Sequence, residues 1–163
     1  MKQVITDPIM LGGMTDCLAA AVENAVIEWG ETVESFFDKF INSTLADSFS
    51  KQEPFVTTGC AGEELVAMVM QKVTGKPQTI KSSSSDIAYS EYYWVGYAIA
   101  LFVAECDVSI KNLIALIPVT EWLRMYLLYH EYGDDLLLEK LKKRVTSRNQ
   151  ANCQTSERNS TER

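Results

Sequence analysis

The sequence predicts an all-α protein, and three observations support this fold class. Apolar residues recur at steps of three and four along several segments, which places them on one face of a helix. Stretches with glycine, proline or many polar residues separate those segments, as expected of loops. No convincing alternation of apolar and polar residues indicates a strand, although residues 54–58 are compatible with a short extended piece. We therefore expect a compact bundle of five or six helices with a buried central helix and a disordered C-terminal tail.

The first periodic segment covers residues 16–42 and predicts one long helix. Thr15 or Asp16 is the expected N-cap, because either side chain can accept a hydrogen bond from the first turn. Gly30 either weakens this helix by about 1 kcal/mol relative to alanine or separates two helices. Because the apolar row keeps its phase across Gly30, we favour one continuous helix. The row consists of Leu18, Val22, Val26, Trp29, Val33, Phe36 and Phe40.

Two stretches are predicted to connect helices. Residues 43–59 form a connector punctuated by Pro54 and Gly59, with one further helical turn expected near 45–49. Residues 76–86 are polar and rich in serine. We interpret this second stretch as a loop and not as a domain boundary, because neither side of it alone has the residues of a complete core.

A second helix is predicted between these connectors, within residues 60–76. Leu65, Val69 and Val73 form one apolar row along it. Two glutamates occupy its expected first turn, where the helix dipole favours acidic side chains. Gly75 lies just past its expected end, where a left-handed cap is typical.

Residues 90–106 predict the central helix, with Ser90 or Asp86 as its N-cap. Its uninterrupted apolar run covers 92–104, which is thirteen residues. A membrane span needs about twenty, so this run is not predicted to cross a membrane. A helix that is apolar on all sides is normally buried in a core, and its tyrosine-rich first turn is the part expected to reach solvent.

Three more helices are predicted in the C-terminal half. Residues 107–118 predict a short helix that ends at Pro118. The next helix is predicted to start after Thr120 and to end at Gly133, and the last begins at Asp134. The apolar row of this last helix consists of Leu137, Leu141 and Val145.

The charge of the chain divides it into two parts. We expect residues 1–145 to form a single helical domain and residues 146–163 to be a disordered polar and basic tail. The net charge is −7, and residues 142–163 carry +4, which leaves −11 on residues 1–141. An acidic body repels phosphate, so direct binding of nucleic acid is disfavoured. It suits a basic protein partner, although acidity can also serve solubility alone.

Residues for catalytic or metal chemistry are sparse. The four cysteines form no CxxC pair and there is one histidine, so we predict no metal site and no disulfide framework. Glycine-rich phosphate loops are missing from the sequence, so no cofactor is expected. The chain starts without an apolar signal-peptide core, and we interpret it as a reduced, cytoplasmic protein. Two enzyme alternatives stay open: Cys60 as a nucleophile with His130 as its base, or His130 with Glu131 in acid–base chemistry.

Aromatic residues gather in two segments, 89–102 and 122–132. Tyr93 and Tyr97 share one helix face by their spacing of four residues. A tyrosine has an apolar ring and a polar tip, which suits interfaces, although tyrosines also line the edges of cores. The predicted partner-binding residues are Glu91, Tyr92, Tyr93, Tyr97, Tyr129, His130, Glu131 and Asp134.

Three stretches resemble segments of small helical proteins predicted in Firmicutes genomes: "FFDKFINSTLADSFSKQEPFVTTGCAGEEL", "SEYYWVGYAIALF" and "IALIPVTEWLRMYLLYHEYGDD". The resemblance spans roughly residues 36–141. Such genes look like members of toxin–antitoxin-like or mobile-element cassettes, which implies a neutralising or accessory role beside a protein partner. The chain departs from the pattern at Tyr97, where the family tends to tryptophan, at Cys60, near a serine of the family, and at Gly133. No site residue is carried over.

These observations predict a non-enzymatic, acidic binding protein that neutralises or accompanies a protein partner by stoichiometric masking of its surface, as antitoxins and inhibitors do. The expected partner is a toxin or a basic protein that handles nucleic acid. No membrane partner is expected, and self-association stays open. The alternatives are a phage-type antagonist of a host defence nuclease and a small enzyme that uses Cys60 or the pair His130 and Glu131.

Overall fold

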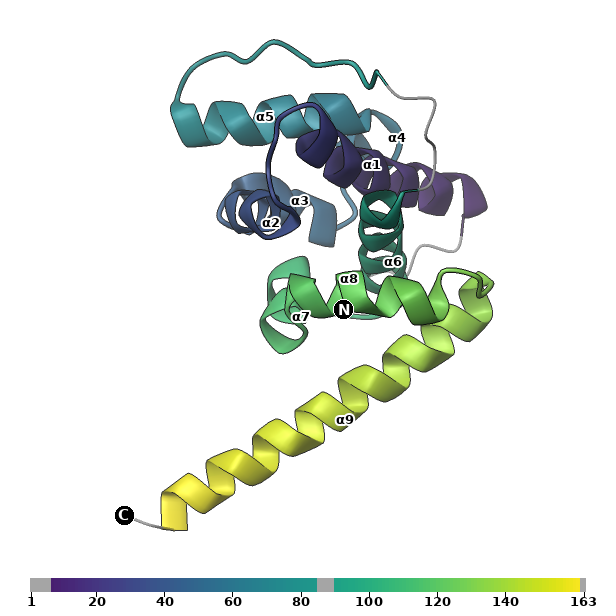
Figure 1. Ribbon diagram of the computed structural model, residues 1–163, viewed down its shortest axis with the longest axis vertical. Helices are drawn as coiled ribbons and strands as arrows, with labels where there is room; N and C mark the ends of the chain where they lie inside the picture. Colours follow the sequence, from purple (N-terminus) through teal and green to yellow (C-terminus); the bar gives the residue numbers. More distant parts are fainter. Residues whose placement is uncertain (1–6, 85–89, 162–163) are drawn as a thin grey trace.

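The computed structural model describes residues 7–84 and 90–161, with side chains described as far as residue 154. Within these residues the protein is all-helical, as predicted, with nine α-helices and no strand (Figure 1). The predicted count of five or six helices is wrong, because residues 16–42 are divided between two helices and the connector 43–59 forms two more. The helices are α1 (Pro8–Ile27), α2 (Val33–Ile41), α3 (Thr44–Ser50), α4 (Pro54–Thr58), α5 (Gly62–Thr74), α6 (Glu91–Glu105), α7 (Ile110–Leu116), α8 (Val119–Tyr129) and α9 (Asp134–Thr161).

α1 begins at Pro8, well before the predicted caps Thr15 and Asp16. Asp7 is the N-cap, and its side-chain oxygen accepts a hydrogen bond from the Ile9 N–H at 2.9 Å. Proline is favoured at the first helical position because an N–H there would have no partner inside the helix. The predicted caps therefore lie inside α1, and the prediction missed its first two turns.

The predicted continuous helix is broken at Gly30. Its φ of 68° is left-handed, a conformation that glycine adopts without strain. The following N–H, of Glu31, turns back to the Ala25 carbonyl at 3.0 Å. Thr32 then caps α2 by accepting a hydrogen bond from the Ser35 N–H at 3.0 Å. The apolar row kept its phase because both helices bury one side in the same core, so phase could not reveal the break.

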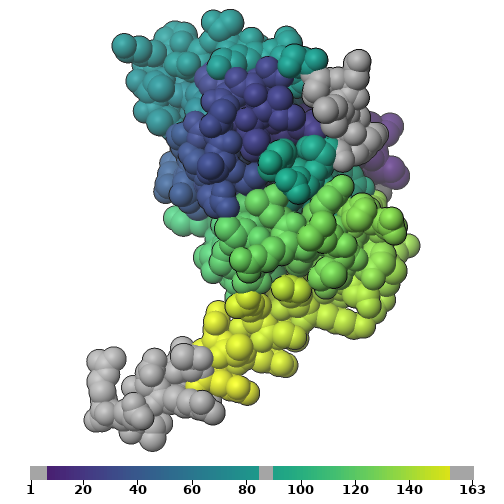
Figure 2. All heavy atoms as spheres, viewed as in Figure 1, coloured from purple at the N-terminus to yellow at the C-terminus, as the bar shows by residue number. Residues whose placement is uncertain are grey.

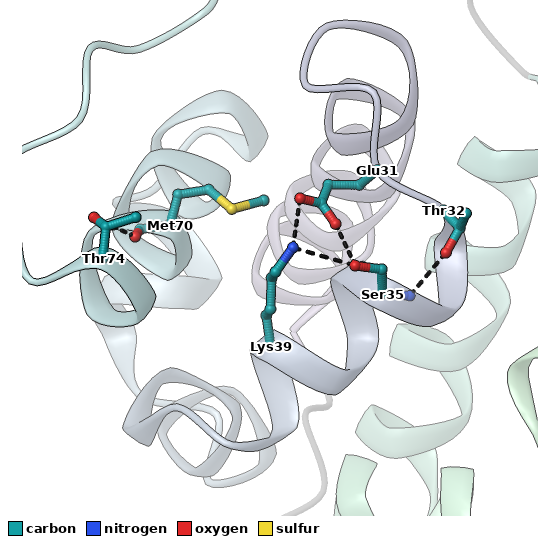
Figure 3. A network of polar contacts seen from close by, with 6 residues as sticks. All are labelled: Glu31, Thr32, Ser35, Lys39, Met70 and Thr74. Carbon is teal, nitrogen blue, oxygen red and sulfur yellow. Dashed lines mark hydrogen bonds and ion pairs between the residues drawn. The ribbon is translucent and has the colours of Figure 1, made fainter.

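A polar network holds the start of α2 to the loop before it (Figure 3). The Lys39 ammonium and the Ser35 hydroxyl both donate to the Glu31 carboxylate, and the ammonium also donates to Ser35 at 3.2 Å. Burial opposes ionisation of Glu31, but the two hydrogen bonds outweigh it and lower the pKa of this carboxyl below its usual value. The network therefore fixes the direction in which α2 leaves the turn.

Two short helices occupy the predicted connector, and the extended piece considered for residues 54–58 is wrong. Those residues form α4, with Pro54 in the first turn and the Thr58 hydroxyl donating to its carbonyl at 3.0 Å. α3 contains the turn predicted near 45–49. It places Phe49 edge-on to Phe40 of α2, with ring centroids 6.0 Å apart.

α6 is the buried central helix that the apolar run predicted. Ser90 caps it by accepting a hydrogen bond from the Tyr93 N–H at 3.2 Å, whereas the alternative cap, Asp86, lies outside the described residues. All residues from 94 to 104 are buried except Tyr97. The exception marks the side of α6 that faces the pocket described below.

α1 is the second core helix, and α6 crosses it closely (Figure 1). A Cβ at Gly96 would lie 2.5 Å from the Leu18 carbonyl oxygen and 2.6 Å from the Ala19 Cα, so the crossing requires a residue without a side chain. α4 and α5 cover other parts of α1. Among the described helices, α1 is also long and apolar enough by length and composition to cross a membrane, and half of that stretch is buried inside the protein.

α9 begins at Asp134, as predicted, but continues as a helix to Thr161. The disordered tail predicted from residue 146 is therefore wrong for residues 146–161, and residues 162–163 lie outside the described chain. Neither glycine nor proline occurs between the ends of α9, so backbone hydrogen bonds continue without an apolar face to bury. Figure 2 shows this helix, in yellow, leaving the body of the protein.

The contacts described between α9 and the body involve residues from Asp134 to Arg148. Leu137 and Leu141 are 1% and 0% exposed. Further along, Glu121 of α8 pairs with Arg144 at 3.5 Å and also with Arg148. These contacts fix α9 beside α8 and place its first residues at the pocket.

Candidate functional site

A pocket of about 490 Å³ lies where α1, α6, α8 and the start of α9 meet. Four of the eight predicted partner-binding residues line it: Tyr93, Tyr97, His130 and Asp134. Its volume is in the usual range for a site that takes a small molecule or a side chain. The complete lining consists of Asp16, Tyr93, Trp94, Tyr97, Tyr126, His130, Tyr132, Asp134 and Leu137.

Helical spacing sets two of the pocket walls. Tyr93 and Tyr97 lie one turn apart on α6, and Tyr126 and His130 lie one turn apart at the end of α8. The tyrosines of α6 are half-buried, although the residues around them on that helix are mostly buried. The close crossing of α6 with α1 then brings Asp16 to the same opening.

Each of the two α6 tyrosines that line the pocket donates a hydrogen bond to a carboxylate from another helix. The Tyr93 hydroxyl donates to Asp16 Oδ1 at 3.1 Å, and the Tyr97 hydroxyl donates to both Asp134 oxygens at 2.9 Å. Burial and the adjacent Asp134 carboxylate raise the pKa of Tyr97 well above its usual value, so its hydroxyl stays a donor. The bonds hold two negative groups in fixed positions, and each carboxylate keeps lone pairs for a further donor.

The other side of the pocket is a stack of rings. Trp94 meets Tyr126 edge-on with centroids 5.9 Å apart, and Tyr126 stacks on His130 at 4.5 Å. The imidazole is held in place because its Nδ1 lies 2.7 Å from the Tyr126 carbonyl oxygen. Tyr132 is packed on Tyr129 at 5.6 Å. Contacts between the aromatic rings thus help to hold them in position, in addition to contacts with the rest of the protein.

The remaining predicted residues do not line the pocket. Glu91 is exposed at the start of α6, and Tyr92 is half-buried beside it. Burial first, then the neighbouring Glu91 charge, raises the pKa of Tyr92. Tyr129 lies behind Tyr132, and Glu131 is exposed with its Oε1 3.9 Å from His130 Nε2.

Sequence reasoning missed five lining residues as members of a site. Tyr126 carried a signal, since it lies one turn before His130 on the same helix face, and Trp94 and Tyr132 belong to the aromatic segments. Leu137 was predicted as core and forms the apolar base. Asp16 carried no signal, because its partner Tyr93 is 77 positions away along the chain.

The pocket has the composition of a cation-binding site. Aromatic ring faces carry negative electrostatic potential, and they attract ammonium and guanidinium groups. The two carboxylates add full negative charge, and none of the nine described lining residues is lysine or arginine. No group of three or more histidine, cysteine or acidic side chains among the described residues is placed to hold a metal ion.

Cys60 and His130, the residues on which the enzyme alternatives depend, lie in different surroundings. Cys60 lies beside the Cys17 thiol and directs its own Sγ to the Ala61 carbonyl at 3.3 Å. The described interactions of His130 are with Tyr126 and Glu131, at the pocket. The nucleophile and base that the sequence left open as a pair are not shown in contact.

Comparison with protein-family models, with curated proteins and with solved structures finds no match to this chain.

Proposed function

We propose that this chain is a non-enzymatic, acidic binding protein that masks the surface of a basic protein partner, and that it receives a lysine or arginine side chain of that partner in the pocket. The observation that carries the proposal is the pairing of aromatic walls with the Asp16 and Asp134 carboxylates. We further propose that it acts in the cytoplasm as an antitoxin-like or inhibitor-like member of a toxin–antitoxin or mobile-element cassette.

The pocket supports a basic side chain as its occupant. A cation over an aromatic ring gains roughly 0.5–2 kcal/mol, more as water is excluded. A carboxylate at the same opening pairs with the guanidinium or ammonium through charge-assisted hydrogen bonds. Tyr97 and Tyr93 hold those carboxylates before the partner arrives, so little side-chain freedom is lost on binding.

The charge of the whole chain supports a basic protein as the owner of that side chain. Residues 1–141 carry −11, a field that accelerates the approach of a positively charged surface and repels nucleic acid. A partner that binds nucleic acid presents such a surface at its own active site. Masking that surface by shape and charge removes the partner's access to its substrate, which suits both a toxin and a host defence nuclease.

Co-purification tests the masking role. The chain is expressed with the product of the adjacent gene, and we expect a stoichiometric complex in which the activity of that product is lost. If the purified proteins form no complex and the activity of the neighbour is unchanged, the antitoxin-like role is contradicted.

A peptide titration tests the pocket separately. The probe is a glycine-rich peptide with one arginine, and its control carries citrulline, which has nearly the same shape without the charge. Nuclear magnetic resonance should show shifts at Trp94 and Tyr126 with arginine and much smaller ones with citrulline. Asp134→Asn should weaken arginine binding about fivefold, which corresponds to about 1 kcal/mol.

The matched control for that variant is Asp135→Asn, at the next, exposed position of α9, which does not line the pocket. It changes the net charge equally and should leave the affinity nearly unaltered. Equal weakening by both variants would mean that only the general acidity of the protein attracts the peptide.

A further inference from the structure

Two cysteine thiols lie together on the side of α1 covered by α4 and α5. Cys17 belongs to α1, and Cys60 belongs to the loop between α4 and α5. The two thiols lie close enough to influence each other electrostatically, and both are free in the structure. Neither contributes to the pocket, so they form a separate feature of the molecule.

The backbone around this loop is held against α1 at two points. A Cβ at Gly13 of α1 would overlap the Thr57 carbonyl oxygen at the end of α4. On the other side of the loop, a Cβ at Gly62 would lie 2.5 Å from the Ala21 backbone nitrogen. Close backbone approach at both ends leaves the loop little room to move away.

Cys17 and Cys60 each lie midway between these two contact points. Gly13, Cys17 and Ala21 follow one another at intervals of four, so they form one row on α1. Cys60 lies between Thr57 of α4 and Gly62 of α5, the two residues that contact the ends of this row. The proximity of the thiols is therefore imposed by the packing of the backbone on both sides.

The two thiols differ in exposure and acidity. Cys17 is 3% exposed, while Cys60 is half-buried and reaches solvent. The interaction with the Cys17 side chain lowers the pKa of the Cys60 thiol, whereas that same interaction and burial raise the pKa of Cys17. Cys60 is thus the thiol that an oxidant meets first and the one that more readily becomes a thiolate.

We propose that Cys17 and Cys60 are an oxidative modification site, at which hydrogen peroxide converts the two thiols into a reversible intrachain disulfide. The Cys60 sulfur attacks one peroxide oxygen, the O–O bond breaks, and the departing hydroxide takes the thiol proton to become water. The product is a sulfenic acid on Cys60. The Cys17 sulfur then attacks the Cys60 sulfur, the S–O bond breaks, and the second hydroxide leaves as water with the Cys17 proton.

The step is balanced: two thiols lose two protons and two electrons, and one peroxide becomes two waters. A dithiol such as dithiothreitol restores both thiols by exchange. Hydrogen peroxide suits the site because it is small and uncharged. Glu63 and Glu64 in the first turn of α5 act electrostatically on the Cys17 thiol, and these carboxylates disfavour an anionic oxidant such as oxidised glutathione.

Peptide mapping of the full chain tests the proposal. The protein is treated with hydrogen peroxide, alkylated, digested with trypsin without reduction and analysed by mass spectrometry. Lysine or arginine residues separate all four cysteines, so each lies in its own peptide. We expect the peptide of Cys17 linked to that of Cys60 as the main product, and its loss after addition of dithiothreitol.

Three single cysteine variants make this test more specific. Cys106→Ser changes another half-buried cysteine and should leave the yield of the linked peptide unaltered. Cys60→Ser should protect Cys17 from oxidation, because the buried thiol then has no partner that meets peroxide first. Cys153→Ser removes the exposed thiol and any link between two molecules that depends on it.

Two outcomes would overturn the proposal. One is overoxidation of Cys60 to sulfinic or sulfonic acid in the wild-type chain while Cys17 stays a free thiol. The other is oxidation of Cys17 at an unchanged rate in the Cys60→Ser variant. The first outcome is measured on the wild-type protein, so it does not depend on whether a variant folds.

Discussion

The Tyr97 hydroxyl donates to both carboxylate oxygens of Asp134 at 2.9 Å, which ties the central helix to the first residue of α9. The two residues are 37 positions apart in the sequence and come from a half-buried and an exposed position. The bond orients a negative group at the pocket and at the same time holds the start of α9 against α6. We therefore expect its loss to lower stability and, if the proposed function holds, to weaken binding at the pocket.

Tyr97→Phe should lower the free energy of unfolding by about 1 kcal/mol, because a hydrogen bond to a charged acceptor is lost near the surface. Urea denaturation measures the change. Tyr92→Phe is the matched control, since Tyr92 is also a half-buried tyrosine of α6 but does not line the pocket. A larger loss for Tyr92→Phe would contradict the role assigned to the Tyr97 hydroxyl.

Stability should fall on the alkaline side because of Tyr97. Its pKa is raised in the folded state, so the folded protein keeps this proton where the unfolded chain loses it. The stabilisation is complete below the ordinary tyrosine pKa of about 10 and decreases as pH rises from there toward the folded pKa. Unfolding measured at a series of alkaline pH values should show a shallower decrease for Tyr97→Phe than for wild type.

Removal of the Lys39 ammonium should weaken the α2 junction. Lys39→Met should cost about 1 kcal/mol of unfolding free energy, because Glu31 then keeps only the Ser35 donor of Figure 3. Lys51→Met, at an exposed lysine at the end of α3, should cost much less. Thermal or urea unfolding of the two variants gives the comparison.

The lowered pKa of Glu31 also predicts that the free energy of unfolding depends on pH in the acidic range. The pKa of Glu31 is lowered in the folded protein, so its contribution is present above the ordinary glutamate pKa of about 4.3 and is lost as pH falls through the folded pKa. Lys39→Met should therefore reduce the pH dependence of unfolding in this acidic window. An unchanged pH dependence would mean that the Lys39 contact does not persist in solution.

Gly96→Ala should destabilise the crossing of α1 and α6 severely. The added Cβ would lie 2.5 Å from the Leu18 carbonyl oxygen, so the helices must separate, at a cost of roughly 1–3 kcal/mol or more. Gly12→Ala is the control within α1, where an added Cβ meets no atom within 4 Å. That substitution should stabilise the helix by about 0.5–1 kcal/mol. Melting temperatures that move in the same direction for both variants would contradict this packing argument.

Much of the fold could be predicted because the signals were local. The apolar run of α6 required burial, Ser90 supplied its cap, Gly75 ended α5 with a φ of 70°, and Asp134 began α9. The prediction of helix bounds failed where neighbouring local signals indicated different structures. The left-handed turn at Gly30 left the apolar phase unaltered, and a polar segment without an apolar face still forms the end of α9.

The residues of the candidate site likewise divide into those that local spacing could reveal and those that it could not. Tyr93 and Tyr97 were recognisable because their spacing of four residues puts them on one face of a single helix, whereas His130 and Asp134 come from the end of α8 and the start of α9. Asp16 beside Tyr93, and Cys17 beside Cys60, result from contacts between distant segments that local pattern does not encode. Helix formation depends on neighbours in the chain, so sequence alone reveals it. The pairing of helices depends on which surfaces fit, and here the glycines at positions 13, 62 and 96 let backbones approach and bring those side chains together.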